Sequence, residues 1–220
     1  MEIKDFGLKD YKEILEWQVN LFNDLVATKK NKVDKKSEYI LIGEHYPVIT
    51  LGRRAKESNL LFPELYLNEK GIYVYHIGRG GDVTYHCPGQ LISYPIIDLE
   101  SHNLGVKDYV NLLEESVIKL LSEYGINGER VEGATGVWLG KGSSLERKIC
   151  AIGIKCSHFC TMHGLALNVN ADLSGFSLIN PCGFIDKGVT SIEKELGHKV
   201  DMGVLKEKYL HILLSLILAL

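Results

Sequence analysis

The segment that most constrains the fold runs from residue 79 to residue 95, RGGDVTYHCPGQLISYP. It holds three glycines, an arginine, an aspartate and a histidine. Glycine is needed where a backbone takes positive φ or approaches another group closely. Residues 72–77 before the segment and residues 91–94 near its end are rich in β-branched and aromatic side chains, as is typical of strands. The segment therefore predicts a polar loop between two strands, where scaffolds commonly place function. A long solvated hairpin loop is the alternative, and composition leaves both open.

Helical periodicity marks the two ends of the chain and one central segment. Asp10 and Glu13 have the spacing of a capping box. The apolar residues that follow fall on one helical face: Ile14, Trp17, Leu21 and Leu25. Residues 106–124 show an apolar stripe at 3.6-residue spacing, with Gly125 where a left-handed cap is expected. Further helices are expected over 189–196 and 204–220.

Strand-like segments fill the middle of the chain. They are residues 39–42, 48–51, 72–77, 91–94, 135–139, 148–155 and 161–169. The last two flank Ser157 and His158 and predict a hairpin, whereas residues 53–70 form a polar connection without clear periodicity. The expected fold class is therefore α/β (α+β), with one mixed β-sheet covered by helices. Residues 1–220 are expected to form a single domain, since this length suits one.

Charge and hydropathy exclude several classes of partner. The formal net charge is −3, which argues against nucleic acid as the main partner. Residues 1–6 lack the pattern of a secretory signal or a transit peptide, so a cytoplasmic location is expected. The apolar segment 210–220 is too short for a bilayer, which needs about 20 residues, so no membrane partner is expected.

The five cysteines predict neither a disulfide scaffold nor a metal site. They are an odd number in a chain without an export signal. Residues 156–163 gather two cysteines and two histidines (Cys156, His158, Cys160 and His163), but no pair of Cys-x-x-Cys elements occurs. Cys150 and Cys156 share the parity of Ile152 and Ile154, so these side chains are expected on one buried face.

Cys182 differs from the other cysteines in its setting. It lies between Pro181 and Gly183, in an irregular loop that would leave the thiol reachable. A thiol is nucleophilic as its thiolate, which a nearby cation favours, and Lys148 at the start of a strand is a candidate. A turn cysteine without a role and an ordinary surface lysine are the alternatives that composition leaves open. No phosphate-binding or dinucleotide motif occurs, so a bound nucleotide is not predicted.

Four ordered segments resemble the octanoyltransferases of lipoate biosynthesis, also called lipoyl(octanoyl) transferases. They are residues 79–95, 148–153 (KICAIG), 161–169 (TMHGLALNV), and 180–183 (NPCG) followed by 188–191 (GVTS). The similarity extends roughly over residues 10 to 200. The resemblance implies the mixed-sheet domain that biotin and lipoate protein ligases share.

The resemblance also implies an acyltransferase and its partners. Octanoyl would move from octanoyl-acyl carrier protein, through a thioester on Cys182, to the ε-amine of a lysine on a lipoyl domain. The acceptors would be lipoyl domains of 2-oxoacid dehydrogenase E2 subunits and the glycine cleavage H protein. No cofactor is implied beyond the phosphopantetheine of the carrier protein, which delivers the octanoyl group, and no metal is implied.

Site residues follow from the matching motifs. Cys182 would carry the acyl group, and Lys148 would match the family lysine that lowers the pKa of that thiol. The residues that would line the acyl site are Arg79, Gly80, Gly81, Asp82, Val83, Thr84, Tyr85, His86, Ala151, Ile152, Gly153, Gly164, Leu165 and Ala166. Two positions depart from the usual motif: Cys87 stands where glycine is usual, and Cys150 where alanine is common. Residues 141–146 lengthen the loop before Lys148.

The proposed chemistry leads to three further expectations. Backbone amides near Gly153 or Gly183 should stabilise the tetrahedral oxyanion of each transfer. An apolar tunnel should hold the acyl chain, with Val83, Tyr85, Ile152 and Leu165 as candidates. Acidic protein substrates should meet a basic rim, for which the candidates are Arg53, Arg54, Lys56, Arg79 and Arg147, although solvated surface charge is the alternative for each.

Three other functions compete with this one. An ATP-dependent lipoate-protein ligase on the same fold would need no acyl-cysteine. An amidotransferase between two lipoyl domains would use a cysteine, but the match at residues 181–183 and Lys148 speaks against it. A non-catalytic acyl-carrier-binding protein would not need to retain both Cys182 and Lys148.

Overall fold

Two β-sheets and the helices around them make up the fold in the computed structural model, which describes residues 1–32, 37–180 and 188–219. Among these residues, the larger sheet has eight strands in the order β1-β2-β6-β10-β9-β8-β7, with β11 paired to β9. The strands are β1 (Glu2–Lys9), β2 (Tyr39–His45), β6 (Gln90–Ile96), β7 (Glu129–Val131), β8 (Ala134–Leu139), β9 (Arg147–Ser157), β10 (Cys160–Asn168) and β11 (Gly188–Val189). The sheet is mixed, because β1 pairs with β2 and β11 with β9 in parallel, while the other pairs are antiparallel.

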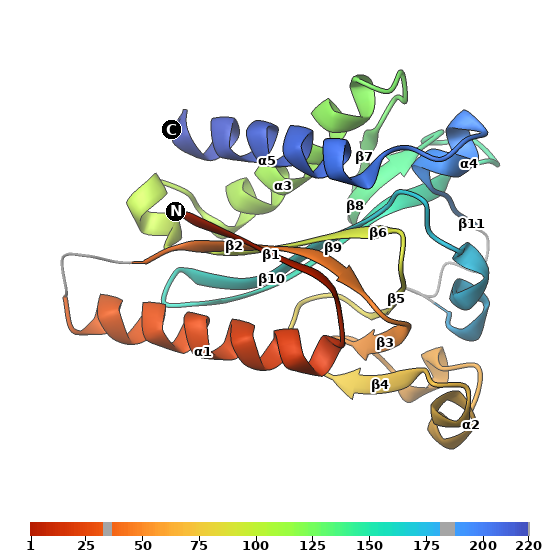
Figure 1. The fold of residues 1–220 in the computed structure, drawn as a ribbon, viewed down its shortest axis with the longest axis horizontal. Coiled ribbons are helices and arrows are strands. Elements are labelled where there is room, and N and C mark those ends of the chain that lie inside the picture. The colour runs from red at the N-terminus through yellow and green to blue at the C-terminus, as the bar shows by residue number, and fades with distance from the viewer. Residues whose placement is uncertain (33–36, 181–187, 220) are drawn as a thin grey trace.

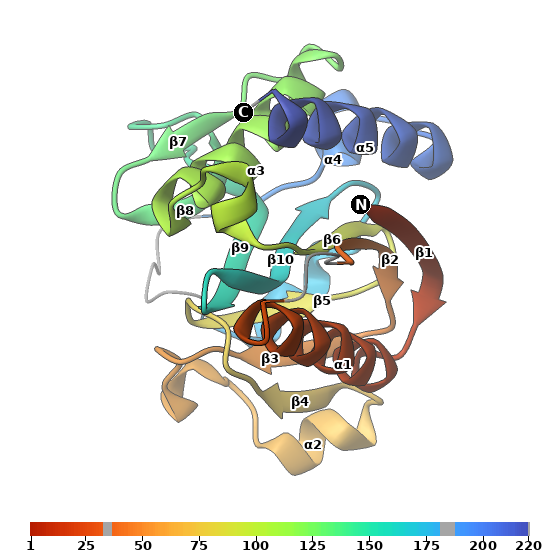
Figure 2. The same ribbon diagram turned by 90° about the vertical axis from the view of Figure 1, so that its left-hand side faces the viewer.

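The smaller sheet has the order β4-β3-β5. Its strands are β3 (Val48–Leu51), β4 (Tyr73–His76) and β5 (Val83–His86). Figure 2 shows this sheet at the end of the molecule remote from α5, next to the short helix α2 (Glu64–Glu69). Three 3₁₀ turns complete the connections: Glu57–Asn59, Leu99–His102 and Leu173–Leu178.

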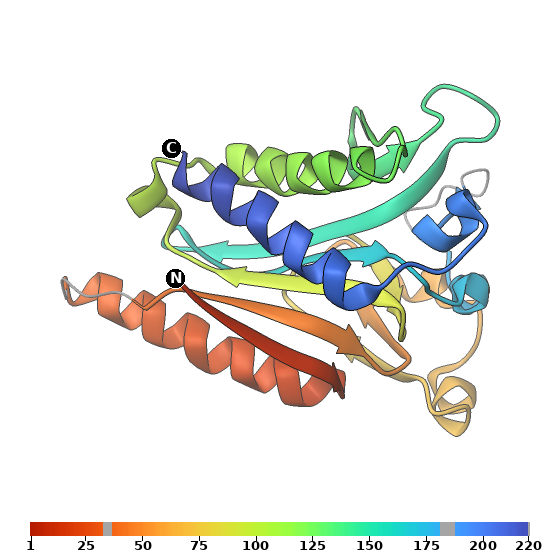
Figure 3. The same ribbon diagram turned by 45° about the horizontal axis from the view of Figure 1, so that its top comes forward.

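Helices cover both faces of the larger sheet (Figures 1 and 3). The helices α3 (Val106–Ser122) and α5 (Met202–Leu218) lie on one face, and α1 (Tyr11–Lys30) lies on the other. The short helix α4 (Ile192–Leu196) precedes α5. One apolar core lies between the sheet and the α3–α5 pair, a second under α1, and a third around the smaller sheet. This arrangement confirms the expected fold class of a mixed sheet covered by helices.

The first helix forms where its apolar stripe predicts, but without the predicted cap. Ile14 and Leu25 are buried, while Trp17 and Leu21 are half-buried at the edge of the stripe. The residues that face the sheet are Tyr11, Ile14, Gln18, Phe22 and Leu25. Asp10 occupies the N-cap position, yet its side chain accepts no hydrogen bond from the helix. The expected capping box is therefore wrong, and burial of the apolar face accounts for this helix.

The two other long helices agree with their sequence patterns. Helix α3 ends at Ser122, slightly earlier than expected, and Gly125 follows with a φ of +71°. Helix α5 begins after Asp201, whose side chain accepts a hydrogen bond from the Val204 amide at 3.0 Å. Within the described residues, no helix has both the length and the apolar character needed to cross a membrane.

Residues 83–86 do not lie in the loop that the sequence predicts. They form strand β5, which pairs antiparallel with β3. Strand β1 and helix α2 were also not predicted. By contrast, the predicted hairpin is confirmed: β9 and β10 pair through a turn at His158 and Phe159, both at positive φ. Cys150 lies in the first core and Ile152, Ile154 and Cys156 pack against it, which confirms the shared face.

Candidate active site

A pocket of about 680 Å³ opens between the two sheets. Its walls come from the segment 79–84, from β5, from β9 and β10, and from residues 133–138 around β8. Of the acyl-site residues predicted from sequence, all but Tyr85 line it: Arg79, Gly80, Gly81, Asp82, Val83, Thr84, His86, Ala151, Ile152, Gly153, Gly164, Leu165 and Ala166. Lys148 lines the same pocket. Segments far apart in the sequence are thus brought together, although their role in binding stays a prediction.

Tyr85 does not line the pocket, because side chains alternate across strand β5. Thr84 and His86 face the pocket, whereas Tyr85 packs in the core of the smaller sheet. Its ring meets Phe176 edge-on, with ring centroids 5.6 Å apart. Tyr85 was expected to form part of the acyl tunnel, and this expectation is wrong. Val83 shares the parity of Tyr85 and the same core, but it reaches the pocket at the start of the strand.

Arg79 is an internal support and not part of a basic rim. Its side chain is 8% exposed. Nη2 donates to the Thr50 carbonyl at 2.8 Å and to Thr50 Oγ1 at 2.9 Å, and Nη1 donates to the Gly80 carbonyl at 3.0 Å. These bonds satisfy a guanidinium that would be costly to bury unpaired. The expectation that Arg79 steers acidic partners is therefore wrong.

The loop that carries the Gly80–Gly81 pair is bonded along its length to residues 52–54. The amides of this neighbouring segment donate to carbonyls of the loop: Gly52 to Asp82, Arg53 to Arg79 and Arg54 to Gly81, at 3.0 to 3.2 Å. The Asp82 carboxylate accepts from Asn59 Nδ2 at 2.8 Å and from the Val83 amide at 2.7 Å. Asp82 thus holds the loop in place, a function that its loop position alone did not reveal.

Two opposed glycines form the floor of the pocket. Gly153 on β9 lies opposite Gly164 on β10. A Cβ on Gly153 would lie 2.8 Å from the Gly80 carbonyl, and one on Gly164 would lie 2.1 Å from the Ser93 carbonyl. The Gly80 amide donates to the Ile154 carbonyl at 2.7 Å, which ties the loop to this floor. Glycine is therefore required here by the close approach of backbones.

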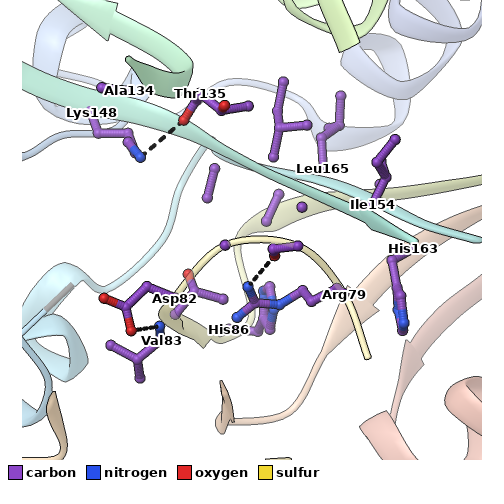
Figure 4. A pocket seen from close by; sticks show the side chains of 18 of the residues that line it. Arg79, Asp82, Val83, His86, Ala134, Thr135, Lys148, Ile154, His163 and Leu165 are labelled. Atoms are coloured by element: carbon purple, nitrogen blue, oxygen red, sulfur yellow. Dashed lines mark hydrogen bonds between the residues drawn. The ribbon is translucent and has the colours of Figure 1, made fainter. Parts of the chain in front are cut away.

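Two contacts hold the Lys148 side chain at the pocket wall (Figure 4). Its Nζ donates to the Thr135 carbonyl at 3.1 Å and lies 4.5 Å from the centroid of the Trp138 ring. Trp138 Nε1 donates in turn to the Ala134 carbonyl at 2.8 Å. Both Thr135 and Trp138 line the pocket, and sequence reasoning did not select either of them. Their position in the strand that precedes Lys148 is the sequence feature that could have indicated them.

One wall of the pocket is aromatic and polar. Tyr11, Tyr94 and His163 line it beside His86, and none of these three was predicted as a site residue. Burial lowers the pKa of His86 to about 3, with added repulsion from His45 and Arg79. Burial likewise lowers the pKa of His163 to about 3. Both imidazoles are therefore neutral near pH 7, so this wall offers hydrogen-bonding groups without positive charge on the histidines.

Cys182 and Gly183 lie outside the described residues, and their predicted roles are untested. The described chain reaches Asn180, whose amide donates to the Asn59 carbonyl at 2.8 Å, and resumes at Gly188. There β11 pairs in parallel with β9, with Val189 next to Lys148 in register. Gly188 and Val189 line the pocket. The described chain therefore resumes beside Lys148.

The two cysteines that depart from the usual motif, Cys87 and Cys150, do not line the pocket. Cys87 is buried, and burial chiefly raises the pKa of its thiol to about 11. Cys150 is fully buried, and burial likewise raises the pKa of its thiol. Neither thiol lines the pocket or forms a thiolate near pH 7. In the described parts of the chain, no group of three or more His, Cys, Asp or Glu side chains could hold a metal ion.

Only part of the predicted basic rim lies at the pocket. Arg53 and Arg54 are exposed and line it, and Lys56 is exposed outside it. Arg147 forms a bidentate pair with Glu195, at 2.7 and 2.5 Å, so its charge is neutralised locally. The longer loop at residues 141–146 forms an exposed turn beyond β8.

Comparisons with known proteins agree with this architecture. Residues 10–213 match the family described as lipoyl protein ligase A/B catalytic domain. The chain is 52% identical to an octanoyltransferase of Bacteroides fragilis, over 98% of this chain and 97% of the relative. It is 49% identical to an octanoyltransferase of Flavobacterium johnsoniae, over 94% of this chain and 92% of the relative.

Solved structures share the fold at low sequence identity. A bipartite lipoate protein ligase from Thermoplasma acidophilum superposes with a TM-score of 0.70 at 17% identity, covering 100% of this chain and 84% of that chain. A biotin protein ligase from Aquifex aeolicus gives a TM-score of 0.55 at 12% identity, covering 100% and 70%. The family match over most of the chain and the high identity to curated relatives lead to one conclusion: the chain belongs to the lipoyl protein ligase A/B catalytic domain family.

Proposed function

We propose that this chain moves octanoyl from octanoyl-acyl carrier protein to the ε-amine of a lysine on a lipoyl domain, through a thioester on Cys182. It is an octanoyltransferase of protein lipoylation, as are the curated relatives that share about half of its residues. One observation carries the mechanism: Lys148 lines the same pocket as the three motif segments that carry the acyl-site residues.

The first half-reaction exchanges one thioester for another. The Cys182 thiolate attacks the carbonyl carbon of the octanoyl thioester and forms a tetrahedral oxyanion. The oxyanion collapses, the bond to the pantetheine sulfur breaks, and that sulfur leaves as a thiol after taking up a proton. Because one thioester replaces another, the step needs no ATP and no cofactor beyond the phosphopantetheine of the carrier protein. Such covalent storage predicts ping-pong kinetics.

The second half-reaction converts the thioester into an amide. The acceptor lysine attacks as a neutral amine, a C–N bond forms, and the C–S bond to Cys182 breaks. The proton lost by the attacking nitrogen leaves with the released thiol or passes to the solvent. The amide is more stable than the thioester, so this step draws the sequence forward. Amides near Gly153 or Gly183 are the proposed oxyanion donors.

Lys148 best serves as the cation that favours the Cys182 thiolate. Carbonyl acceptance and an indole face both favour an ammonium over a neutral amine. A second proposed role, taking up the proton of the incoming lysine, needs the neutral amine. Both contacts act against that form, so they support the first role more than the second.

The acyl chain fits the apolar part of the pocket. Ile152, Leu165 and Val83 line it, and Ile154 extends that surface. Burying seven or so methylene-sized groups at about 0.8 kcal/mol each contributes on the order of 5 kcal/mol before ordering losses. A much shorter acyl group would lose most of this contribution. The pocket therefore supports selection for a medium-length chain.

A lipoylation enzyme acts on proteins that carry lipoyl domains, and which of these proteins this chain modifies is part of the proposal. We propose lipoyl domains of 2-oxoacid dehydrogenase E2 subunits and the glycine cleavage H protein as acceptors, in the cytoplasm. Among solved structures with this fold is a lipoate-protein ligase A bound with ATP, which is similar in fold alone at 15% identity and a TM-score of 0.69. An ATP requirement for turnover would favour that ligase chemistry.

Intact-protein mass spectrometry tests the proposal. After incubation with octanoyl-acyl carrier protein and no ATP, the wild-type chain should gain one octanoyl mass, and Cys182→Ala should gain none. Cys87→Ala is the matched control, since its buried thiol does not line the pocket, and it should acylate normally. Acylation that persists in Cys182→Ala, or that appears only with ATP, would contradict the mechanism.

A further inference from the structure

A single peptide group lies between Glu114 and Lys148. The amide of Gly136 donates to Glu114 Oε1 at 3.0 Å. The carbonyl of the same peptide group, which belongs to Thr135, accepts from Lys148 Nζ at 3.1 Å. The N–H and C=O of a trans peptide point in opposite directions. A carboxylate from α3 and the ammonium from β9 therefore contact opposite ends of one rigid plane.

The local backbone allows this arrangement only with glycine at residue 136. Gly136 has a φ of +120°, and a Cβ there would lie 2.4 Å from the Cys150 carbonyl. The pairing of β8 with β9 shifts register just beyond it, between Val137 and Trp138. The β8–β9 pairs run from Val137 to Leu139 and leave out Gly136, so its buried N–H needs a partner from elsewhere. Glu114 supplies that partner.

The carboxylate of Glu114 is itself held in place. It is 6% exposed, and its Oε2 accepts from Arg130 Nε at 3.1 Å. Arg130 also donates through Nη2 to Glu115 Oε2 at 2.8 Å and to the Asn111 carbonyl at 2.9 Å. A buried carboxylate persists only when it is paired and hydrogen-bonded. Helix α3 thus presents a fixed acceptor to strand β8.

The same part of β8 also provides the aromatic contact of Lys148. The Trp138 ring that contacts the ammonium is tied through Nε1 to the Ala134 carbonyl. Ala134 immediately precedes the Thr135–Gly136 peptide. Any rotation of that peptide would therefore disturb both the carbonyl and the aromatic contact of Lys148. Figure 4 shows the Lys148–Thr135 bond at the pocket wall.

We propose that Glu114 is a positioning residue for Lys148, acting through the Thr135–Gly136 peptide group. Its carboxylate fixes the plane of that peptide and polarises it, which strengthens the carbonyl as an acceptor of the ammonium. The inference rests on the proposed function, because it assumes that Lys148 supports acylation of Cys182. Glu114 touches neither substrate nor Lys148.

Single-turnover acylation by octanoyl-acyl carrier protein tests this role. Glu114→Met keeps the length of the side chain but removes the acceptor. The acylation rate should fall about tenfold to a hundredfold, the range that follows from misplacing a catalytic group by about 1 Å. The carrier-protein KM should stay unchanged, since the docking surface is intact. Glu114→Gln keeps an acceptor oxygen and should remain within about threefold of wild type.

Two controls separate positioning from general stability. Glu115→Met removes the other carboxylate partner of Arg130 without touching the peptide, and it should acylate as wild type does. In a Lys148→Ala background, Glu114→Met should slow acylation by less than about twofold, because the two residues act as one unit. Thermal unfolding of the same variants shows what each loses in stability.

Several outcomes would overturn the inference. A Glu114→Met variant that acylates as fast as wild type would overturn it. So would a Glu114→Met substitution that slows acylation by the same factor in the Lys148→Ala background as in the wild-type background. If Glu114→Met does not fold, Glu114→Asp takes its place, because it keeps the charge while withdrawing the oxygens from Gly136. The same selective loss is expected for it, and its absence would overturn the inference too. A wild-type chain that takes up no octanoyl would instead refute the proposed function.

Discussion

Arg79 and Thr50 join the glycine loop of the pocket to the smaller sheet. The Arg79 guanidinium contacts both the carbonyl and the hydroxyl of Thr50, which lies on strand β3. The loop and the strand are therefore held at a fixed separation. A planar fork can bond both Thr50 oxygens together, whereas a lysine ammonium is a point charge.

We expect Arg79→Lys to lower the free energy of unfolding by about 2 kcal/mol, because buried bonds to a charged group are lost. Denaturant titration measures this change. Arg53→Lys, at an exposed neighbouring position, should stay within about 0.5 kcal/mol of wild type. Equal effects of the two substitutions would show that the Thr50 contacts do not stabilise the fold.

Gly164→Ala should destabilise the chain and narrow the pocket. The new Cβ would lie 2.1 Å from the Ser93 carbonyl, so strands β10 and β6 would have to separate. Overpacking of this kind costs about 1–3 kcal/mol. Gly78→Ala is the matched control, because its Cβ would meet only the Lys155 side chain at 3.5 Å. Calorimetry of both variants checks the difference, and a Gly164→Ala variant as stable as Gly78→Ala would contradict the packing argument.

Charge reversal at Arg53 and Arg54 should slow association with the acyl carrier protein and flatten its salt dependence. Both side chains are exposed at the pocket, where they can steer an acidic partner. Stopped-flow association rates over a range of ionic strength measure the effect. Lys119→Glu, at an exposed position of α3 away from the pocket, is the control for a change in net charge. Unchanged rates in the arginine variants would remove this pair from the docking surface.

The buried histidines predict a loss of stability in acid. Burial lowers the pKa of His45 to about 4, and those of His86 and His163 to about 3. The unfolded chain therefore binds more protons than the folded chain below pH 6.5. The histidine contribution is fully present above that pH and is lost as the pH falls from 6.5 towards 4 for His45 and towards 3 for His86 and His163. Each group contributes a slope of up to about 1.4 kcal/mol per pH unit in this window.

A single substitution tests the contribution of one buried histidine to this pH dependence. His45→Gln removes a group that is buried between Phe6 and Tyr94 and hydrogen-bonded to Tyr94 at 3.0 Å. Its free energy of unfolding should be lower at pH 7 but should fall less steeply between pH 6.5 and 4.5. His198→Gln, at an exposed position, should parallel wild type. A His45→Gln slope as steep as the wild-type slope would contradict the role of burial.

Local patterns in the sequence were sufficient for much of the fold. The stripe of α3, the glycine at residue 125 and the β9–β10 hairpin depend on neighbours within a few residues, and the structure confirms them. The motif segments also predicted which residues would gather: the pocket contains all of the expected acyl-site residues except Tyr85.

Contacts between distant residues decided the rest. Strand β5 exists because β3 pairs with it, and that pairing turns Tyr85 towards a core and away from the pocket. Arg79 can be buried because Thr50 lies beside it and accepts hydrogen bonds from its guanidinium. The Thr135–Gly136 peptide turns towards Glu114 because a helix packs there. Spacing along the chain encodes helices, turns and strand parity, whereas the partner of a buried polar group is set only once the layers pack.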